Sequence, residues 1–185
     1  MAAELTDNAA ISALRSVAHP VRLRILSLLT AEAMSAAEVA RTLDLTHANA
    51  SYHLRVLHDA GELIIEGEEK IRGGTAKRYR YVVGCDPERP SSPPSPEDEI
   101  AWQHATGHEV VRRLGQRVTG PGSSSDIETW VEPETWLEAV RLIRSAMNLL
   151  HEHARPSHTG GTVHVSASSQ AFLMAPSEWP PGVAQ

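Results

Sequence analysis

The sequence predicts a mainly α-helical protein that carries one small β-hairpin. Three observations lead to this fold class. Residues 35–60 hold two apolar-striped helical segments separated by a tight break, and residues 63–83 hold two β-branched and aromatic runs around a Gly-Gly pair. Farther on, apolar side chains recur at spacings of four and three in two stretches between residues 100 and 150. We therefore predict a winged helix-turn-helix domain at 1–84, followed by a helical region with short strands at 97–174.

Two helical segments are predicted before residue 30. An apolar stripe indicates a first helix that ends near Ala18, and Pro20 suits the first position of a second helix, where no backbone N–H is needed. The stripe of the second helix comprises Val21, Ile25, Leu28 and Leu29. We interpret His19 as a packed or capping group; the alternative is that His19 and Arg22 place charge near a nucleic-acid backbone.

The next two helices form the helix-turn-helix. Ser35 followed by Glu38 makes a capping box, which predicts a helix start. After a short break, the Thr46 hydroxyl can cap the second helix, which we place at 46–60. Gly61 tolerates the positive φ that ends a helix. The buried stripe of helix 46–60 comprises Ala50, Leu54 and Leu57.

The opposite face of helix 46–60 is polar. At about 100° per residue, Asn49, Tyr52 and Arg55 lie there together with Ala48, while Ser51 and His53 lie at the flanks. Asn can pair with adenine edges, Arg with guanine or phosphate, and hydroxyl groups with phosphate oxygens. This chemistry predicts contact with DNA; the alternative is an ordinary solvated helix surface.

The segment 63–83 predicts a wing. Leu63–Ile65 opens one strand, and tyrosine and valine side chains fill the returning run up to Val83. Residues 70–80 contain five positive charges and no acid: Lys70, Arg72, Lys77, Arg78 and Arg80. Such a hairpin can reach the phosphates of an adjacent minor groove; the alternative is a solvated hairpin tip.

Three runs of sequence carry a family resemblance: HPVRLRILSLL at 19–29, EVARTLDLTHANASYHLRVLHDAGEL at 38–63 and RGGTAKRYRY at 72–81. Residues 8–83 resemble the ArsR-type winged helix-turn-helix regulators, in particular the actinomycete-like branch with an extra C-terminal region. The resemblance implies a homodimer, with the first helix in the dimer contact, that binds an inverted repeat in double-stranded DNA. It also implies that the following residues face DNA: Thr46, His47, Asn49, Ser51, Tyr52 and Arg55.

Composition and charge narrow the class further. No apolar run approaches the roughly 18 residues that span a bilayer, and MAAELTDNAA lacks the pattern of a signal peptide. A single cysteine suits a reducing compartment, so we expect a cytoplasmic protein. Residues 1–84 contain ten Lys or Arg and ten Asp or Glu, whereas residues 85–185 contain seven and thirteen. The net charge of −6 therefore belongs to the C-terminal half, which predicts moderate, salt-sensitive DNA binding.

A Pro- and Ser-rich linker is predicted at 85–96. Ser95 and Pro96 can start a helix whose apolar stripe comprises Ile100, His104, Gly107, Val111, Leu114 and Val118. Pro133 can open another helix, with a stripe of Trp136, Val140, Ile143, Met147 and Leu150. Short strands are predicted at 129–131 and 162–167, and the tail at 175–185 is expected to be loose. We expect this region to support dimerisation; the alternative is that it encloses an effector.

Ten histidines raise the question of a metal site. His104 and His108 are the candidate pair, because imidazoles at i and i+4 can share a zinc or nickel ion. The Cys-x-Cys pair that some ArsR-type relatives use is absent, since residues 39–41 are Val-Ala-Arg. We predict no metal and no cofactor. Enzyme signatures such as a phosphate-binding loop, a Gly-x-Ser-x-Gly elbow or a His-Glu-x-x-His motif are also absent, so we predict no enzymatic activity.

The leading hypothesis is a homodimeric, sequence-specific transcriptional repressor. Helix 46–60 would enter the major groove, and the wing at 63–83 would contact the backbone through Lys70, Arg72, Lys77 and Arg78. Two alternatives stay open. The chain could be a metal- or small-ligand-responsive sensor that uses the same DNA mechanism, or a winged-helix module for protein interaction.

Overall fold

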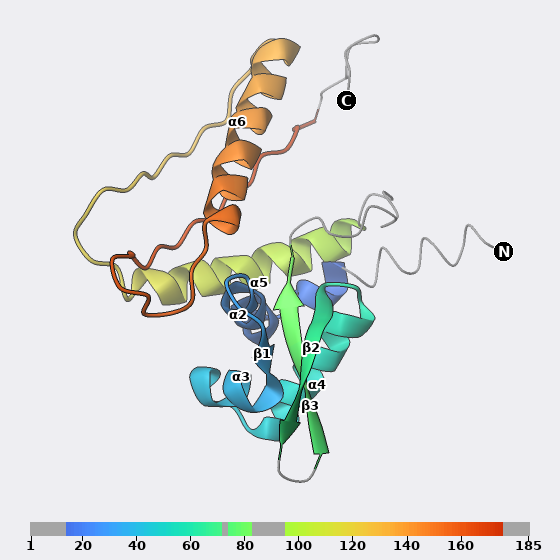
Figure 1. Cartoon of the computed structure of the whole chain (residues 1–185). Coiled ribbons are helices and arrows are strands. Elements are labelled where there is room, and N and C mark those ends of the chain that lie inside the picture. Colours follow the sequence, from blue (N-terminus) through green and yellow to red (C-terminus); the bar gives the residue numbers. More distant parts are fainter. Residues whose placement is uncertain (1–13, 72–73, 83–94, 176–185) are drawn as a thin grey trace, which may run out of the picture. The chain divides into compact units, whose positions relative to one another are not determined.

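The computed structural model describes residues 14–71, 74–82 and 95–175 (Figure 1). Its helices and strands follow in the order α2 (Pro20–Leu29), β1 (Met34–Ser35), α3 (Ala36–Leu43), α4 (His47–Asp59), β2 (Leu63–Ile71), β3 (Gly74–Tyr81), α5 (Pro96–Leu114) and α6 (Pro133–Glu152). Residues 14–17 are also helical. By contacts, the chain divides into two units: Met1–Gln116 with Ala154–Thr162, and Arg117–His153 with Val163–Gln185. No helix in the described part is both long and apolar enough to cross a lipid bilayer.

The first unit contains a three-stranded antiparallel sheet with the order β1-β3-β2 (Figure 1). β2 and β3 form the predicted wing, which pairs from Leu63 opposite Tyr81 to Ile71 opposite Gly74. A register shift between Ile65 and Gly67 marks a bulge, which increases the local twist of a hairpin. The third strand, β1, was not predicted, because two residues are too few to show an alternating pattern. The winged helix-turn-helix fold is thus confirmed.

A mainly aliphatic core holds the helix-turn-helix to the sheet. The buried apolar side chains in this cluster are Val17, Ile25, Leu26, Leu29, Val39, Ala40, Ala50, Leu54, Leu57, Leu63 and Tyr79. The predicted helix ends are also confirmed. Ser35 and Glu38 form a capping box at the start of α3, and Gly61 follows α4 with a φ of 75°.

Helix α5 packs against α2 with the face opposite to the predicted stripe. Ser95 caps α5 by accepting a hydrogen bond from the Asp98 N–H. The buried residues of α5 are Asp98, Ala105 and Glu109. The predicted stripe is exposed instead: Ile100 keeps 58% of its surface and Val111 70%. The expected end of the stripe was wrong as well, because α5 stops at Leu114 and Val118 lies beyond it.

Helix α6 belongs to the second unit and contains no buried residue. The strands predicted at 129–131 and 162–167 are wrong, because both segments lack regular secondary structure. Strands need hydrogen-bonded partners, and side chains in both segments are solvent-exposed, with Trp130 at 80%. The predicted linker up to residue 94 and the predicted tail from residue 176 lie outside the described residues.

Candidate nucleic-acid interface

Helix α4 has one buried face and one exposed polar face. Ala50, Leu54 and Leu57 are completely buried in the core and fix the rotation of the helix about its axis. The exposed face carries Thr46, His47, Asn49 and Arg55, together with Tyr52, which keeps 53% of its surface. Ser51 is half-buried at the flank, as expected from the helical projection. Five of the six predicted contact residues of this segment are therefore exposed to solvent, and the sixth, Ser51, is half-buried.

The first turn of α4 is tied down by its own cap. The Thr46 hydroxyl accepts a hydrogen bond from the Asn49 N–H over 3.2 Å. This bond satisfies one of the backbone donors that a helix start leaves unpaired. The Arg55 Nε donates to the Ser51 carbonyl over 3.4 Å, which leads the guanidinium stem along the helix surface. Hydrogen bonds at Thr46 and Arg55 thus hold both ends of the exposed polar face of α4.

A cluster of two imidazoles and a guanidinium lies where α4 meets the start of α2. The His19 Nδ1 accepts a hydrogen bond from the Val21 N–H over 3.1 Å, so His19 is the N-cap of α2. Its ring centroid is 5.0 Å from that of His53 on α4. Burial and the nearby Arg22 lower the pKa of His19, while burial, His19 and Arg22 lower the pKa of His53. The prediction of a structural, capping role for His19 is confirmed.

The wing is less basic than residues 70–80 alone suggested. Three acids of β2 oppose the cations of β3: Glu66 lies 3.8 Å from Arg80, Glu69 lies 3.3 Å from Arg78, and Glu68 is the register partner of Lys77. Lys70 and Lys77 are exposed, and Arg72 lies outside the described residues. The exposed Lys70 and Lys77 are therefore better placed to meet phosphate than Arg78 and Arg80 are.

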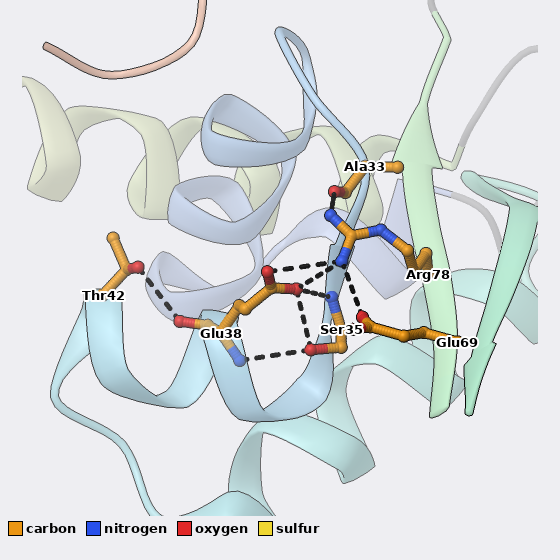
Figure 2. A network of polar contacts seen from close by, with 6 residues as sticks. All are labelled: Ala33, Ser35, Glu38, Thr42, Glu69 and Arg78. Carbon is orange, nitrogen blue, oxygen red and sulfur yellow. Dashed lines mark hydrogen bonds and ion pairs between the residues drawn. The ribbon is translucent and has the colours of Figure 1, made fainter. Parts of the chain in front are cut away.

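Arg78, which was predicted as a DNA contact, is half-buried and binds groups of its own domain. Figure 2 shows its guanidinium between Glu38, Glu69 and the Ala33 carbonyl. Its Nη1 donates to Glu38 Oε2 over 3.0 Å and to Glu69 Oε2 over 3.3 Å, and its Nη2 donates to the Ala33 oxygen. The pKa of Glu38 is lowered mainly by the hydrogen bond from the Ser35 backbone N–H. The Ser35 hydroxyl and Arg78 lower it further. Sequence patterns missed this network because its members are up to 45 positions apart.

The histidines of α5 do not gather further metal ligands in the described residues. His104 and His108 are both exposed, although the stripe had placed His104 among packed side chains. His108 Nδ1 lies 3.8 Å from Glu109 Oε1, and the buried Glu109 carboxylate is bound by Arg112 Nε at 2.8 Å. Across residues 14–71, 74–82 and 95–175, no three His, Cys, Asp or Glu side chains are grouped as a metal ion would require.

The comparison with known families agrees with this geometry. Residues 17–64 match the sequence profile of a family described as a helix-turn-helix domain. The match runs from the end of the first helical segment through α4 to the start of β2. No curated protein matches the chain. Together with the wing, the match supports a DNA-binding transcriptional regulator.

Proposed function

We propose that the chain is a homodimeric, sequence-specific repressor of the ArsR type that binds an inverted repeat in promoter DNA. One observation carries the proposal: the polar face of α4 is exposed while its apolar face is fully buried. A helix presented in this way can enter a major groove without any rearrangement of the core. Asn49 supplies a base-reading side chain, Arg55 supplies a phosphate contact from α4, and Lys70 and Lys77 supply phosphate contacts from the wing.

The exposed stripe of α5 supports a second copy of the chain as partner. Ile100, Val111 and Leu114 are more than half exposed along the same face, opposite the face that packs on α2. Apolar residues at spacings of four and three pair helices of two subunits in many bundles. An inverted repeat requires a two-fold symmetric protein, so the dimer and the operator belong to one proposal.

Selection of bound genomic fragments tests the function directly. We expect recovered sites to share an inverted repeat with half-sites about 10 base pairs apart. Arg55→Ala should weaken binding to the recovered operator across sequences. Asn49→Ala should relax the preference at one base position by about 1–3 kcal/mol. Arg144→Ala, at an exposed position of α6, is the control and should bind like the wild type.

The outcome that contradicts the proposal is clear. If both α4 variants keep the affinity and salt slope of the wild type, α4 does not contact DNA. If no fragment is retained at low or moderate salt, the winged fold serves another purpose, and the protein-interaction hypothesis takes precedence.

A further inference from the structure

The side chain of Arg78 joins three segments of the winged domain. It projects from β3 and reaches Glu69 on β2, Glu38 on α3 and the Ala33 carbonyl just before β1 (Figure 2). Backbone pairing reinforces this junction, because Ser35 of β1 is the register partner of Arg78. The base of the wing is therefore attached to the segment that starts the helix-turn-helix.

Glu38 performs two tasks at this junction with one carboxylate. Its Oε2 accepts from the Ser35 N–H at 2.7 Å and the Ser35 hydroxyl at 2.8 Å, which completes the capping box of α3. The same oxygen accepts from Arg78 at 3.0 Å, and Oε1 accepts from it at 3.3 Å. The carboxylate that caps α3, the first helix of the helix-turn-helix, thus also binds β3 of the wing.

A guanidinium is the side chain that this junction requires. Its planar fork presents several N–H donors in fixed directions, whereas an ammonium group is a single point with flexible donors. The Arg78 and Glu38 side chains are each 30% exposed. Ion pairs that water reaches add little to stability. We therefore expect the Arg78–Glu38 pair to act mainly by orienting β3 relative to α3.

Lys77 offers a contrast one residue away. Neighbouring strand residues point to opposite faces, so Lys77 and Arg78 project in opposite directions from β3. Lys77 is exposed, whereas the Arg78 guanidinium contacts two acids and a carbonyl. A cation with its donors engaged in this way is poorly placed to meet phosphate.

We propose that Arg78 is a positioning residue for DNA binding: it fixes the wing relative to α3 and α4 through Glu38, Glu69 and Ala33, and it does not contact DNA. This inference rests on the proposed function. Under this proposal Glu38 favours DNA binding, although its negative charge by itself would repel the DNA backbone. Direct phosphate contact by Arg78 predicts the reverse, because removal of the Glu38 charge would then release Arg78 and strengthen binding.

Two conservative variants separate these mechanisms. Glu38→Gln keeps a side chain that can serve the capping box, since Gln is accepted at that position, but it removes the charge and one acceptor oxygen. Arg78→Lys keeps the positive charge but loses the fork. Lys77→Gln is the control for a true phosphate contact. Affinity for the operator recovered from genomic DNA is measured as a function of salt, with hydroxyl-radical footprints of each complex.

If Arg78 positions the wing, Glu38→Gln and Arg78→Lys should each weaken DNA binding by about tenfold. Because both residues belong to one hydrogen-bond network, their effects should not add. The double variant should be no weaker than the weaker single variant. Protection at the wing contacts should be lost while protection in the major groove stays. Because the phosphate contacts of Lys70 and Lys77 are lost together with this protection, the salt slope should fall by about two for both variants, whereas Lys77→Gln should reduce it by about one.

The inference is overturned if Glu38→Gln binds as tightly as the wild type or more tightly, or if Arg78→Lys binds normally. Far-UV circular dichroism verifies that each variant is folded. If one variant does not fold, the affinity and footprint of the other decide. A wild-type chain that retains no DNA refutes the proposed function itself, which is distinguishable from a DNA-binding chain in which Glu38→Gln has no cost.

Discussion

Helices α4 and α6 are both amphipathic, but only α4 has its apolar side completely buried in its own unit. Leu54 and Leu57 of α4 are completely buried, whereas the apolar stripe of α6 is at most half-buried and its Leu150 keeps 43% of its surface. The same kind of periodicity thus yields two different outcomes. A periodic stripe predicts a helix and one apolar face, but it does not identify the surface that covers that face.

The largest expected difference between the two helices is in core truncation. Leu54→Ala should lower the free energy of unfolding by about 2–5 kcal/mol, because it removes a completely buried side chain and leaves a cavity. Leu149→Ala in α6 should change it by no more than about 0.5 kcal/mol. Urea denaturation followed by circular dichroism measures both. Equal losses would mean that α6 is buried in the protein as it exists in solution.

The exposed stripe of α5 should matter for association rather than for folding of one chain. Val111→Asp places a charge on this stripe and should raise the dissociation constant of the proposed dimer by about 100-fold or more. Ala101→Asp, exposed but off the stripe, should leave it near the wild-type value. Sedimentation velocity over a range of concentrations gives both constants. A wild-type chain that is monomeric at every concentration contradicts the dimer.

Helix caps provide a smaller and more local test. Thr46→Ala removes the side-chain acceptor at the start of α4 and should cost about 0.5–2 kcal/mol of unfolding free energy. The N-cap of α6, Glu132, makes no side-chain capping bond, so Glu132→Ala should cost almost nothing. Thermal unfolding of both variants beside the wild type makes the comparison. A cost at Glu132 as large as at Thr46 would contradict it.

The smallest expected effect comes from protonation of His19 and His53. Their lowered pKa values mean that the unfolded chain binds these protons more readily than the folded chain does. The stability that depends on neutral His19 and His53 is therefore fully present above the ordinary histidine pKa of about 6.5. It is lost as the pH falls from there through the pKa values of the two histidines in the folded chain. The charged form is disfavoured by burial and by the positive charge of Arg22, which lowers the pKa of both rings.

Melting temperatures at pH 7.5 and 5.5 measure this dependence. His53→Gln should reduce the difference between the two temperatures, whereas His153→Gln, at an exposed position after α6, should leave it unchanged. The explanation is wrong if the two variants respond to pH alike.

Local chemistry within 14–82 was enough to predict most of the winged domain. Capping residues such as Ser35 and Thr46, the stripe of α4 and the glycine after it each act over a few positions, so they are visible in the sequence. The exposed face of α4 followed from the same geometry. These predictions hold because each depends on hydrogen bonds and burial that neighbouring residues supply.

Features that depend on distant partners could not be predicted in this way. The surroundings of Arg78 differ from those of Lys77 because Glu38 on α3 and the Ala33 carbonyl before β1 accept hydrogen bonds from the Arg78 guanidinium. The strands predicted at 129–131 and 162–167 failed for a related reason, since alternation indicates an extended segment but cannot supply a pairing partner.

The sequence by itself determined the kind of domain, the boundaries of its helices and which side chains α4 presents. Tertiary structure alone decided which face of α5 is covered and which cations of the wing are already engaged. The reason is physical: helix starts and stripes arise from interactions over three or four residues, whereas burial and ion pairing arise from groups that the chain brings together from far apart.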